Sequence, residues 1–190
     1  MKSEAVSPRV RIIEAATDLF YGQGINATGV AEVAERAGVS KRTLYHLFPS
    51  KDILVAEYLK AADADIETNE HSLLRTDLTA REQLLALFDR PQLAVNFRGC
   101  PFHNAAVELS DANHPGNPLV VEHKHAFLRQ IIDTARRAGA RDPDLLGRQL
   151  AVIFEGAMAL SASLNSLEGF DFARTAAKAL ISQALPVEQD

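Results

Sequence analysis

The amino-acid sequence predicts an all-α protein of about nine helices, arranged as a small N-terminal domain and a larger C-terminal domain. Apolar residues recur at intervals of three and four along most of the chain, as they do on the buried face of an α-helix. Capping residues, glycines and prolines divide these stretches into separate helices. No stretch alternates between polar and apolar residues as a half-buried β-strand does, and no segment is repeated.

Composition places the chain among soluble globular proteins. Of its 190 residues, 47% are hydrophobic and 24% are charged, which is ordinary for that class. No uninterrupted run of about 18 apolar residues predicts a membrane span. The N-terminal residues MKSEAVSPRV lack the apolar core of a signal peptide. A single cysteine cannot form an internal disulfide bond. We therefore expect a cytoplasmic protein without a membrane partner.

The first two predicted helices lie before residue 38. Pro8 is able to start a helix, and the stretch Arg9–Gly22 has apolar residues at helical spacing. Thr28 is a candidate N-cap for the next helix, since a threonine hydroxyl can accept a hydrogen bond from the first turn. The apolar stripe of this second helix comprises Val30, Val33, Ala34 and Ala37. Gly38 follows, and a glycine stops a helix in the left-handed conformation without steric cost.

A third short helix is predicted at Lys41–Leu47. Ser40 is its N-cap candidate, and Pro49 ends it. Leu44 and Phe48 fall on the inward face of this helix. The polar side chains left for its outer face are Lys41, Arg42, Thr43, Tyr45 and His46. Ser50 then caps a further helix, which has Lys51 in its first turn.

Two short helices joined by a glycine turn, the second with a basic and hydroxyl-rich outer face, are typical of a helix-turn-helix that reads DNA. The second helix fits the major groove, where Lys41, Arg42 and Thr43 reach base edges. The residues expected to hold backbone phosphates are Ser40, Tyr45, His46 and Lys51, and Thr28 completes the candidate DNA-binding set. The alternative is a three-helix part of a core whose polar face is merely solvated.

Charge is distributed unevenly along the chain. Residues 1–51 contain seven Lys and Arg against five Asp and Glu, a net charge of +2, whereas residues 52–190 carry a net charge of −7. The net charge of −5 therefore conceals a positive end. One face of the protein is expected to approach DNA, and binding should weaken as the salt concentration rises.

Six further helices are predicted after residue 51. Their expected limits are Asp52 to about Glu70, Leu78 to about Leu93, Pro101 to about Ser110, Leu119–Ala138, Pro143 to about Leu164, and Asp171 to about Leu185. Thr79 is an N-cap candidate for the second of these, and Asp142 for the fifth. The helix from Asp52 is a stiff connection that can act as a lever on the reading helix.

The last two predicted helices are apolar on more than one face. The first of them carries Leu145, Leu146, Leu150, Val152, Ile153, Phe154, Met158, Leu160 and Leu164. A helix that is apolar all round must be buried, and a second copy of the chain would cover the side left bare by the domain's own core. A two-fold symmetric homodimer is therefore predicted. The alternative is that these helices are simply core.

The N-terminal residues resemble a known family. The segments FYGQGINAT and VAEVAERAGVSKRTLYHLFPSKDIL are similar to the DNA-binding domain of the tetracycline-repressor (TetR) family of transcriptional regulators. The similarity covers about 45 residues, from Arg9 to Leu54, without a gap. The positions that carry it are Phe20, Gly24, Thr28, Val30, Ala34, Ala37, Gly38, Val39, Ser40, Leu44, Tyr45, Phe48, Lys51 and Leu54. Arg42 departs from the family, which often has a small residue at this position.

The resemblance implies a helix-turn-helix DNA-binding domain at residues 1–52 and a helical ligand-binding and dimerisation domain at residues 53–190. It implies a sequence-specific transcriptional regulator, a repressor that a small-molecule effector releases from a palindromic operator in double-stranded DNA. In such a homodimer the last two helices of each subunit form a four-helix bundle. No catalytic activity, cofactor or metal is expected.

A ligand pocket is expected among apolar residues of the larger domain. The candidates are Leu84, Phe88, Phe97, Phe102, Val107, Phe127, Ile131 and Phe154. Most residues of this kind are ordinary core. Few charges interrupt the apolar stripes, which indicates an uncharged or weakly polar effector.

Two other functions compete with a ligand-responsive regulator. Cys100 lies close to His103, and a thiol with a base would suit an enzyme, although no hydrolase signature accompanies the pair. A buried structural thiol is commoner, and a redox-sensing thiol would have to be exposed. The other competing function is a nucleoid-type DNA protein that binds without sequence choice.

A metal site is another alternative. Its candidate ligands lie close together in sequence but match no zinc-ligand spacing: His103, Glu108, His114, His123 and His125.

Overall fold

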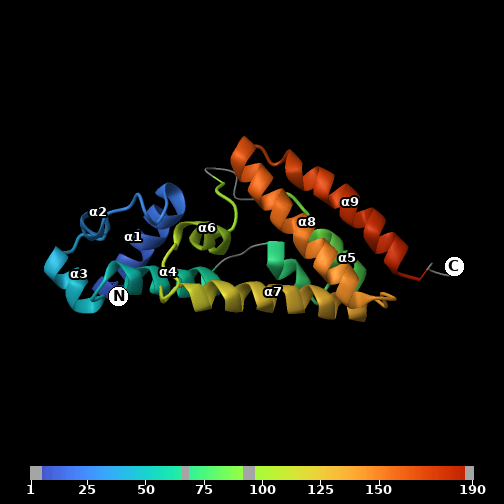
Figure 1. The fold of residues 1–190 in the computed structure, drawn as a ribbon, viewed down its shortest axis with the longest axis horizontal. Coiled ribbons are helices and arrows are strands. Elements are labelled where there is room, and N and C mark those ends of the chain that lie inside the picture. The colour runs from blue at the N-terminus through green and yellow to red at the C-terminus, as the bar shows by residue number, and fades with distance from the viewer. Residues whose placement is uncertain (1–5, 66–68, 92–96, 187–190) are drawn as a thin grey trace, which may run out of the picture. The chain divides into compact units, whose positions relative to one another are not determined.

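The structure, a computed structural model of the chain, describes residues 6–65, 69–91 and 97–186. Every regular element in these ranges is helical (Figure 1). The helices are α1 (Pro8–Gln23), α2 (Val30–Arg36), α3 (Lys41–Leu47), α4 (Lys51–Asp65), the 3-10 helix η1 (Asn69–Leu74), α5 (Ala80–Ala86), α6 (Pro101–Glu108), α7 (Asn117–Arg137), α8 (Pro143–Leu164) and α9 (Glu168–Ala184). The all-α class predicted from the sequence is confirmed.

Short-range capping explains why most helices begin where the sequence predicts. The Ser40 hydroxyl accepts a hydrogen bond from the Thr43 N–H at 3.0 Å, and the Asp142 carboxylate accepts one from the Leu145 N–H at 2.9 Å. Such bonds satisfy backbone donors that the first helical turn leaves unpaired. Ser7 caps α1 in the same way, a role that the sequence analysis did not assign.

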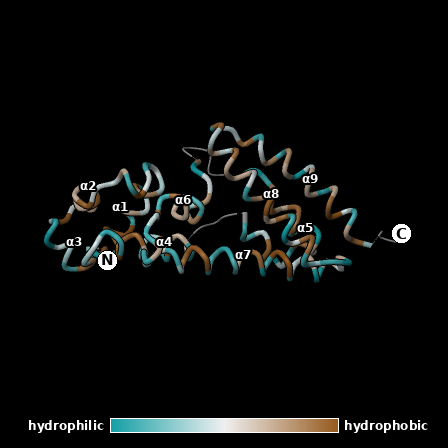
Figure 2. The backbone as a smooth tube through the Cα atoms, in the orientation of Figure 1, coloured by the Kyte–Doolittle hydropathy of each residue, from teal (hydrophilic) through white to brown (hydrophobic). Residues whose placement is uncertain are grey.

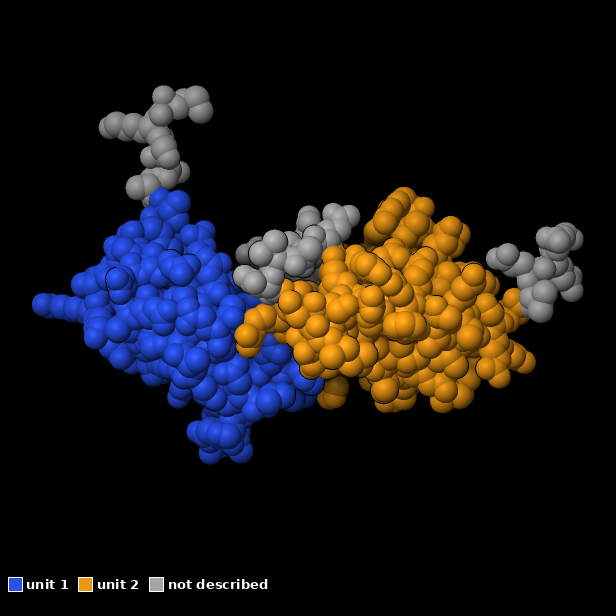
Figure 3. All heavy atoms as spheres, turned by 90° about the horizontal axis from the view of Figure 1, so that it is seen from above, with its two compact units in different colours: residues 1–66, 101–123 blue, residues 67–100, 124–190 orange. Residues whose placement is uncertain are grey.

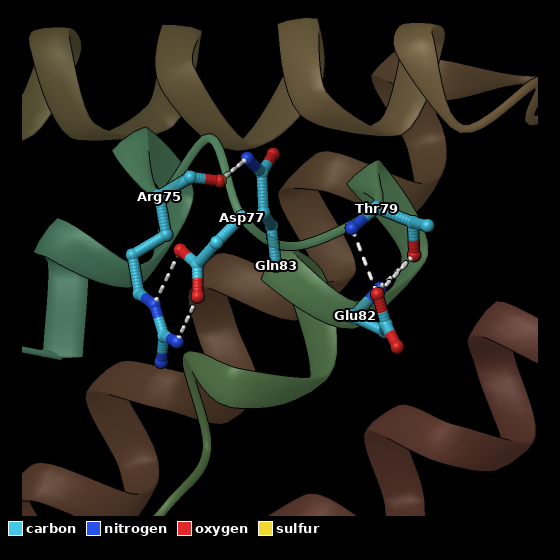
Figure 4. A network of polar contacts seen from close by, with 5 residues as sticks. All are labelled: Arg75, Asp77, Thr79, Glu82 and Gln83. Carbon is cyan, nitrogen blue, oxygen red and sulfur yellow. Dashed lines mark hydrogen bonds and ion pairs between the residues drawn. The ribbon is translucent and has the colours of Figure 1, made fainter.

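Thr79 and Glu82 form a complete capping box at the start of α5 (Figure 4). The Glu82 carboxylate accepts hydrogen bonds from the Thr79 hydroxyl at 2.7 Å and the Thr79 N–H at 2.8 Å. These two bonds hold the pKa of Glu82 below its ordinary value. The bond from the Thr79 hydroxyl has the larger effect. Beside the box, the Gln83 amide donates to the Arg75 carbonyl and the Arg75 guanidinium pairs with Asp77, which joins η1 to α5.

Three predicted helices have a limit that differs by three or more residues from the structure. The helix expected from Asp52 to about Glu70 is α4, which ends at Asp65. Residues 66–68 lie outside the described ranges, and the 3-10 helix η1 follows them. The helix expected from Leu78 to about Leu93 is the much shorter α5, and its predicted end also lies outside those ranges. The last helix begins at Glu168, three residues before Asp171.

The chain divides into two compact units, each built from two separate segments (Figure 3). The first unit comprises residues 1–66 and 101–123, and the second comprises residues 67–100 and 124–190. The domains predicted from the sequence, residues 1–52 and 53–190, divide the chain elsewhere, because α4, α6 and the first residues of α7 group with the N-terminal helices. The functional division at residue 52 stays a prediction.

The core of the first unit lies where α1 contacts α2 and α4. Phe20 of α1 meets Tyr58 of α4 edge to face, with 5.6 Å between ring centroids. The other large apolar side chains buried there are Ile12, Leu19, Leu44, Phe48, Leu54 and Leu59. This core fixes the inward faces of α2 and α3, so that their polar faces point to solvent.

The core of the second unit is centred on Phe154 of α8. Its ring lies within 5.2–6.3 Å, centroid to centroid, of the rings of Phe88, Phe127 and Phe170. The helices α8 and α9 pack along each other. Along α7, hydrophobic and hydrophilic residues alternate by helical turn, as expected for a helix with one buried face (Figure 2).

Among the described helices, α8 is long and apolar enough to cross a membrane by length and composition alone. Its sequence contains no uninterrupted apolar run of that length because Arg148 and Glu155 lie within the helix. The core helix of a soluble protein passes the same test, and α8 packs on α9 and buries Phe154 in the core of its unit. The length of α8 is therefore weak support for a membrane span.

Candidate nucleic-acid interface

The turn between α2 and α3 has the geometry that a helix-turn-helix requires. Gly38 adopts a φ of 63°, a left-handed conformation that favours glycine. The N–H of Gly38 donates to the Glu35 carbonyl at 3.0 Å, and the N–H of Val39 donates to the Ala34 carbonyl at 2.9 Å. The Arg11 guanidinium of α1 satisfies the Ala37 carbonyl at 2.9 Å. Each of these bonds holds the end of α2 in place.

The two faces of α3 differ as the sequence predicts. Leu44 is fully buried and Phe48, directly after the helix, is 1% exposed. On the other face Tyr45 is 49% exposed, and Ser40, Lys41, Arg42 and His46 are exposed as well. The helix therefore presents its cationic and hydroxyl side chains to solvent, while two buried apolar side chains attach it to the core.

Two members of the predicted interface are partly buried. The Thr43 hydroxyl lies 2.9 Å from the Ser40 hydroxyl, so the two share a hydrogen bond at the start of α3. Lys51 is half-buried at the first position of α4, where Ser50 caps the helix by accepting from the Ile53 N–H at 3.2 Å. A lysine beside the unpaired N–H groups of a first helical turn suits an anion such as a phosphate.

The structure corrects the role predicted for Thr28. Gly29, not Thr28, is the N-cap of α2, and no side chain caps this helix. The Thr28 side chain is 1% exposed, and its hydroxyl donates inward to the Gly24 carbonyl at 2.8 Å. This bond satisfies the donor of the buried hydroxyl inside the protein. Thr28 therefore supports the loop before α2, and its predicted contact with DNA stays a prediction.

Glu108, the last residue of α6, holds the same loop from a distant part of the sequence. Its carboxylate accepts a hydrogen bond from the Asn26 N–H at 2.7 Å, and its carbonyl accepts one from the Asn26 side-chain amide at 3.1 Å. From the sequence, Glu108 is a candidate only for a metal site. One feature of the sequence could have indicated a structural role: Glu108 stands at the C-terminal end of a helix, where the helix dipole disfavours negative charge.

We expect Glu108→Ala to lower the free energy of unfolding by about 1–2 kcal/mol, because a charged acceptor for a backbone N–H is lost. For a chain of this size the melting temperature should fall by roughly 3–6 °C. Glu122→Ala, at an exposed position of α7, is the matched control. Equal melting temperatures for the two variants, measured by circular dichroism, would contradict the role of Glu108.

Arg9 has partners within the first unit, although its side chain is exposed. Its guanidinium pairs with Glu57 and lies 5.2 Å from the centre of the Phe48 ring. Glu57 also accepts a hydrogen bond from Lys60 at 2.8 Å. The pKa of the Glu57 carboxyl lies below its ordinary value. The hydrogen bond from Lys60 lowers this pKa most, burial raises it, and the bond from Arg9 lowers it further.

The predicted ligand contacts fall in two places. Leu84, Phe88, Phe127, Ile131 and Phe154 are buried in the core of the second unit, and Phe97 packs against it. Phe102 belongs to the first unit, where its ring stacks on His123 with 3.6 Å between centroids. Val107 is 73% exposed. These residues form core contacts or surface, and their role in binding a ligand stays a prediction.

Cys100 is buried and lies in the second unit beside a lysine. The Lys124 ammonium donates to the Cys100 sulfur at 3.3 Å and also pairs with Glu155. Burial, the largest single influence, lowers the pKa of Lys124, but Cys100 and Glu155 together raise it above its ordinary value. The lysine is thus charged at neutral pH, and the cluster is a charge-paired contact between α7 and α8.

Two histidines of the cluster, His114 and His123, pair with aspartates of α4. His123 Nδ1 lies 2.8 Å from an Asp63 oxygen, and His114 Nε2 lies 3.5 Å from an Asp52 oxygen. His114 Nδ1 also accepts a hydrogen bond from the Gly116 N–H at 3.0 Å. No group of three or more His, Cys, Asp or Glu side chains that could hold a metal ion occurs in the parts of the chain that the structure describes.

Comparison with known proteins first identifies the N-terminal helices. Residues 12–58 match the family model described as "Bacterial regulatory proteins, tetR family". The "HTH-type transcriptional repressor KstR2" of Rhodococcus jostii is 33% identical over 124 residues, which cover 65% of this chain and 57% of that repressor. The match thus spans little more than half the length of that relative.

Solved structures extend the similarity over nearly the whole chain. The crystal structure of a TetR-type transcriptional regulator from Streptomyces avermitilis is 34% identical, with a TM-score of 0.80, and the match covers 94% of this chain and 98% of that one. The TetR-family transcriptional regulator SCO4454 of Streptomyces coelicolor is 28% identical, with a TM-score of 0.83, and the match covers 94% and 90% of the two chains.

Proposed function

Since the chain belongs to the TetR family of DNA-binding transcriptional regulators, we propose that it is a cytoplasmic repressor that a small-molecule effector releases from a palindromic operator. The family comprises transcriptional regulators and not enzymes. The observation that carries the proposal is the division of α3 into a buried apolar face and an exposed face of cationic and hydroxyl side chains.

In this proposal α3 enters the major groove, and its exposed face contacts the operator. Arg42 and Lys41 reach base edges from the first turn, with the Ser40–Thr43 hydroxyl pair beside them. The side chains that hold phosphates are Tyr45, His46 and Lys51. The buried residues Leu44 and Phe48 set the angle at which this face is presented, because they attach α3 to the core.

The proposed homodimer forms through α8 and α9. On α8 the exposed apolar side chains Leu145, Val152, Leu160 and Leu164 are spaced by seven, eight and four residues, so they share one face of the helix. Gly156 lies on the same face with no atom within 4 Å of a Cβ built on it. A second copy would cover this face and fix the separation of two reading helices.

Effector binding is proposed for the larger domain, residues 53–190, near the aromatic core around Phe154. Supporting this proposal, the core contains several large apolar side chains of the kind that line pockets for weakly polar ligands. In the proposed dimer, an effector could bind more tightly to a conformation in which the spacing of the two α3 helices does not match the operator. Such an effector would release the operator.

The proposed function is tested with DNA that flanks the protein's own coding region. In gel-shift titrations, the protein should retard this DNA in the presence of excess unrelated competitor DNA, and a compound that binds the larger domain should reverse the shift. Retardation of all DNA with equal affinity would instead support a nucleoid-type protein. Absence of any retardation would overturn the proposal.

Lys51→Ala should weaken binding to operator and random DNA by the same factor, because a phosphate contact carries no sequence information. The slope of log affinity against log salt concentration should become shallower by about one. Lys60→Ala, which removes a lysine elsewhere on α4, is the control and should leave the slope unchanged. A loss confined to the operator would show that Lys51 contacts a base instead.

A further inference from the structure

The arginines of the first unit are not equally available for DNA. Arg9 pairs with Glu57, Arg11 donates to the carbonyls of Ala37 and Gly38, and Arg36 lies 3.9 Å from Asp18. Among the arginines that the structure describes in this unit, Arg42 alone has neither a carboxylate nor a carbonyl partner. Its guanidinium is therefore free to bind a group outside the protein.

Arg42 also occupies a position from which base edges can be reached. It is exposed at the second residue of α3, and the N-terminal residues of a recognition helix are those that contact bases in the major groove. Its neighbour Thr43 is partly buried, and the Thr43 hydroxyl is engaged with Ser40. Of the first three side chains of α3, Arg42 is the one that combines exposure with a planar, multivalent donor group.

We propose that Arg42 is a specificity-determining residue that reads a guanine in each half-site of the operator. This inference rests on the proposed function, since it assumes that α3 lies in the major groove. A guanine presents two acceptors, O6 and N7, at the major-groove edge, and the two parallel N–H groups of a guanidinium match both. An adenine at the same place presents a donor in place of O6, which opposes an arginine donor.

The neighbouring lysine is less suited to this discrimination. The ammonium of Lys41 is a compact, strongly hydrated charge on a flexible stem, whereas the fork of Arg42 is planar and preorganised. Lys41 therefore adds positive charge beside the base edges, and Arg42 contributes the choice of guanine. The chemical class of the ligand is a G·C base pair with its guanine N7 and O6 exposed in the major groove.

The inference is tested by selecting binding sites from random DNA with the wild-type protein, Arg42→Ala and, as control, Lys41→Ala. Wild type and Lys41→Ala should both select an invariant guanine in each half-site. Arg42→Ala should lose the preference at this position alone, with operator affinity reduced about ten- to hundredfold. Because the Arg42 side chain is exposed and has no carboxylate or carbonyl partner, the variant should melt at the wild-type temperature.

Substituting 7-deazaguanine at the selected position removes the N7 acceptor without altering Watson–Crick pairing. This change should weaken binding of the wild type severalfold and leave Arg42→Ala unaffected. Selected sites without an invariant guanine, a guanine preference that survives in Arg42→Ala, or one that disappears only in Lys41→Ala would overturn the inference while leaving the proposed function intact. Failure of the wild type to select any site would overturn both.

Discussion

Replacing Gly147 with alanine is expected to lower the free energy of unfolding by about 2–3 kcal/mol. Gly147 is buried on α8, and a Cβ placed on it would lie 2.5 Å from Ile132 Cγ1 of α7. The Ile132 side chain could rotate away, but the same Cβ would also lie 3.0 Å from Ile132 Cα and 3.1 Å from its backbone N. Relief therefore requires α7 and α8 to separate at this point.

Helix propensity opposes this clash only in part. Alanine favours an α-helix over glycine by about 1 kcal/mol, so a glycine kept within α8 already costs stability. The net loss should lower the melting temperature by roughly 5–10 °C in a chain of this size.

Gly22→Ala is the matched control for this variant. Gly22 lies in α1, is exposed, and has no atom within 4 Å of a Cβ built on it. This control should melt at the wild-type temperature or slightly above it. A melting temperature of Gly147→Ala equal to that of the wild type, measured by calorimetry or circular dichroism, would show that α7 and α8 do not approach closely at this residue.

Val152→Asp is expected to convert the proposed homodimer into monomers. Val152 is 73% exposed in the single chain and lies in the middle of the apolar face of α8. At a two-fold interface each substitution acts twice, since both copies bring the same patch, and two buried carboxylates without partners are strongly unfavourable. The variant should sediment with the mass of one chain at micromolar concentration.

Loss of the dimer should also weaken operator binding by about 10²- to 10⁴-fold, because the second half-site is no longer bound intramolecularly. Val107→Asp is the matched control: Val107 of α6 is also 73% exposed but lies outside α8 and α9. This control should retain the dimeric mass and the operator affinity of the wild type. A wild-type protein that sediments as a monomer, or a dimeric Val152→Asp, would overturn the proposed dimer.

The reading motif could be predicted from sequence because its determinants are local. Ser40 and Thr43 are three residues apart, and Gly38 stands where the chain must adopt a positive φ. Interactions within one turn depend little on the rest of the fold, so the limits of α3 were predicted to the residue. The buried Leu44 and the exposed Tyr45 follow from helical periodicity for the same reason.

The sequence by itself determined the helical class, the caps of α3, α5 and α8, and the exposed polar face of α3, all of which arise from contacts within a few residues. Only the tertiary structure decided what Thr28, Glu108 and Gly147 do. Glu108 meets Asn26 across 82 positions in the chain, and Gly147 matters because of a neighbouring helix. Packing brings such residues together, and no short-range pattern records which partner a side chain meets there.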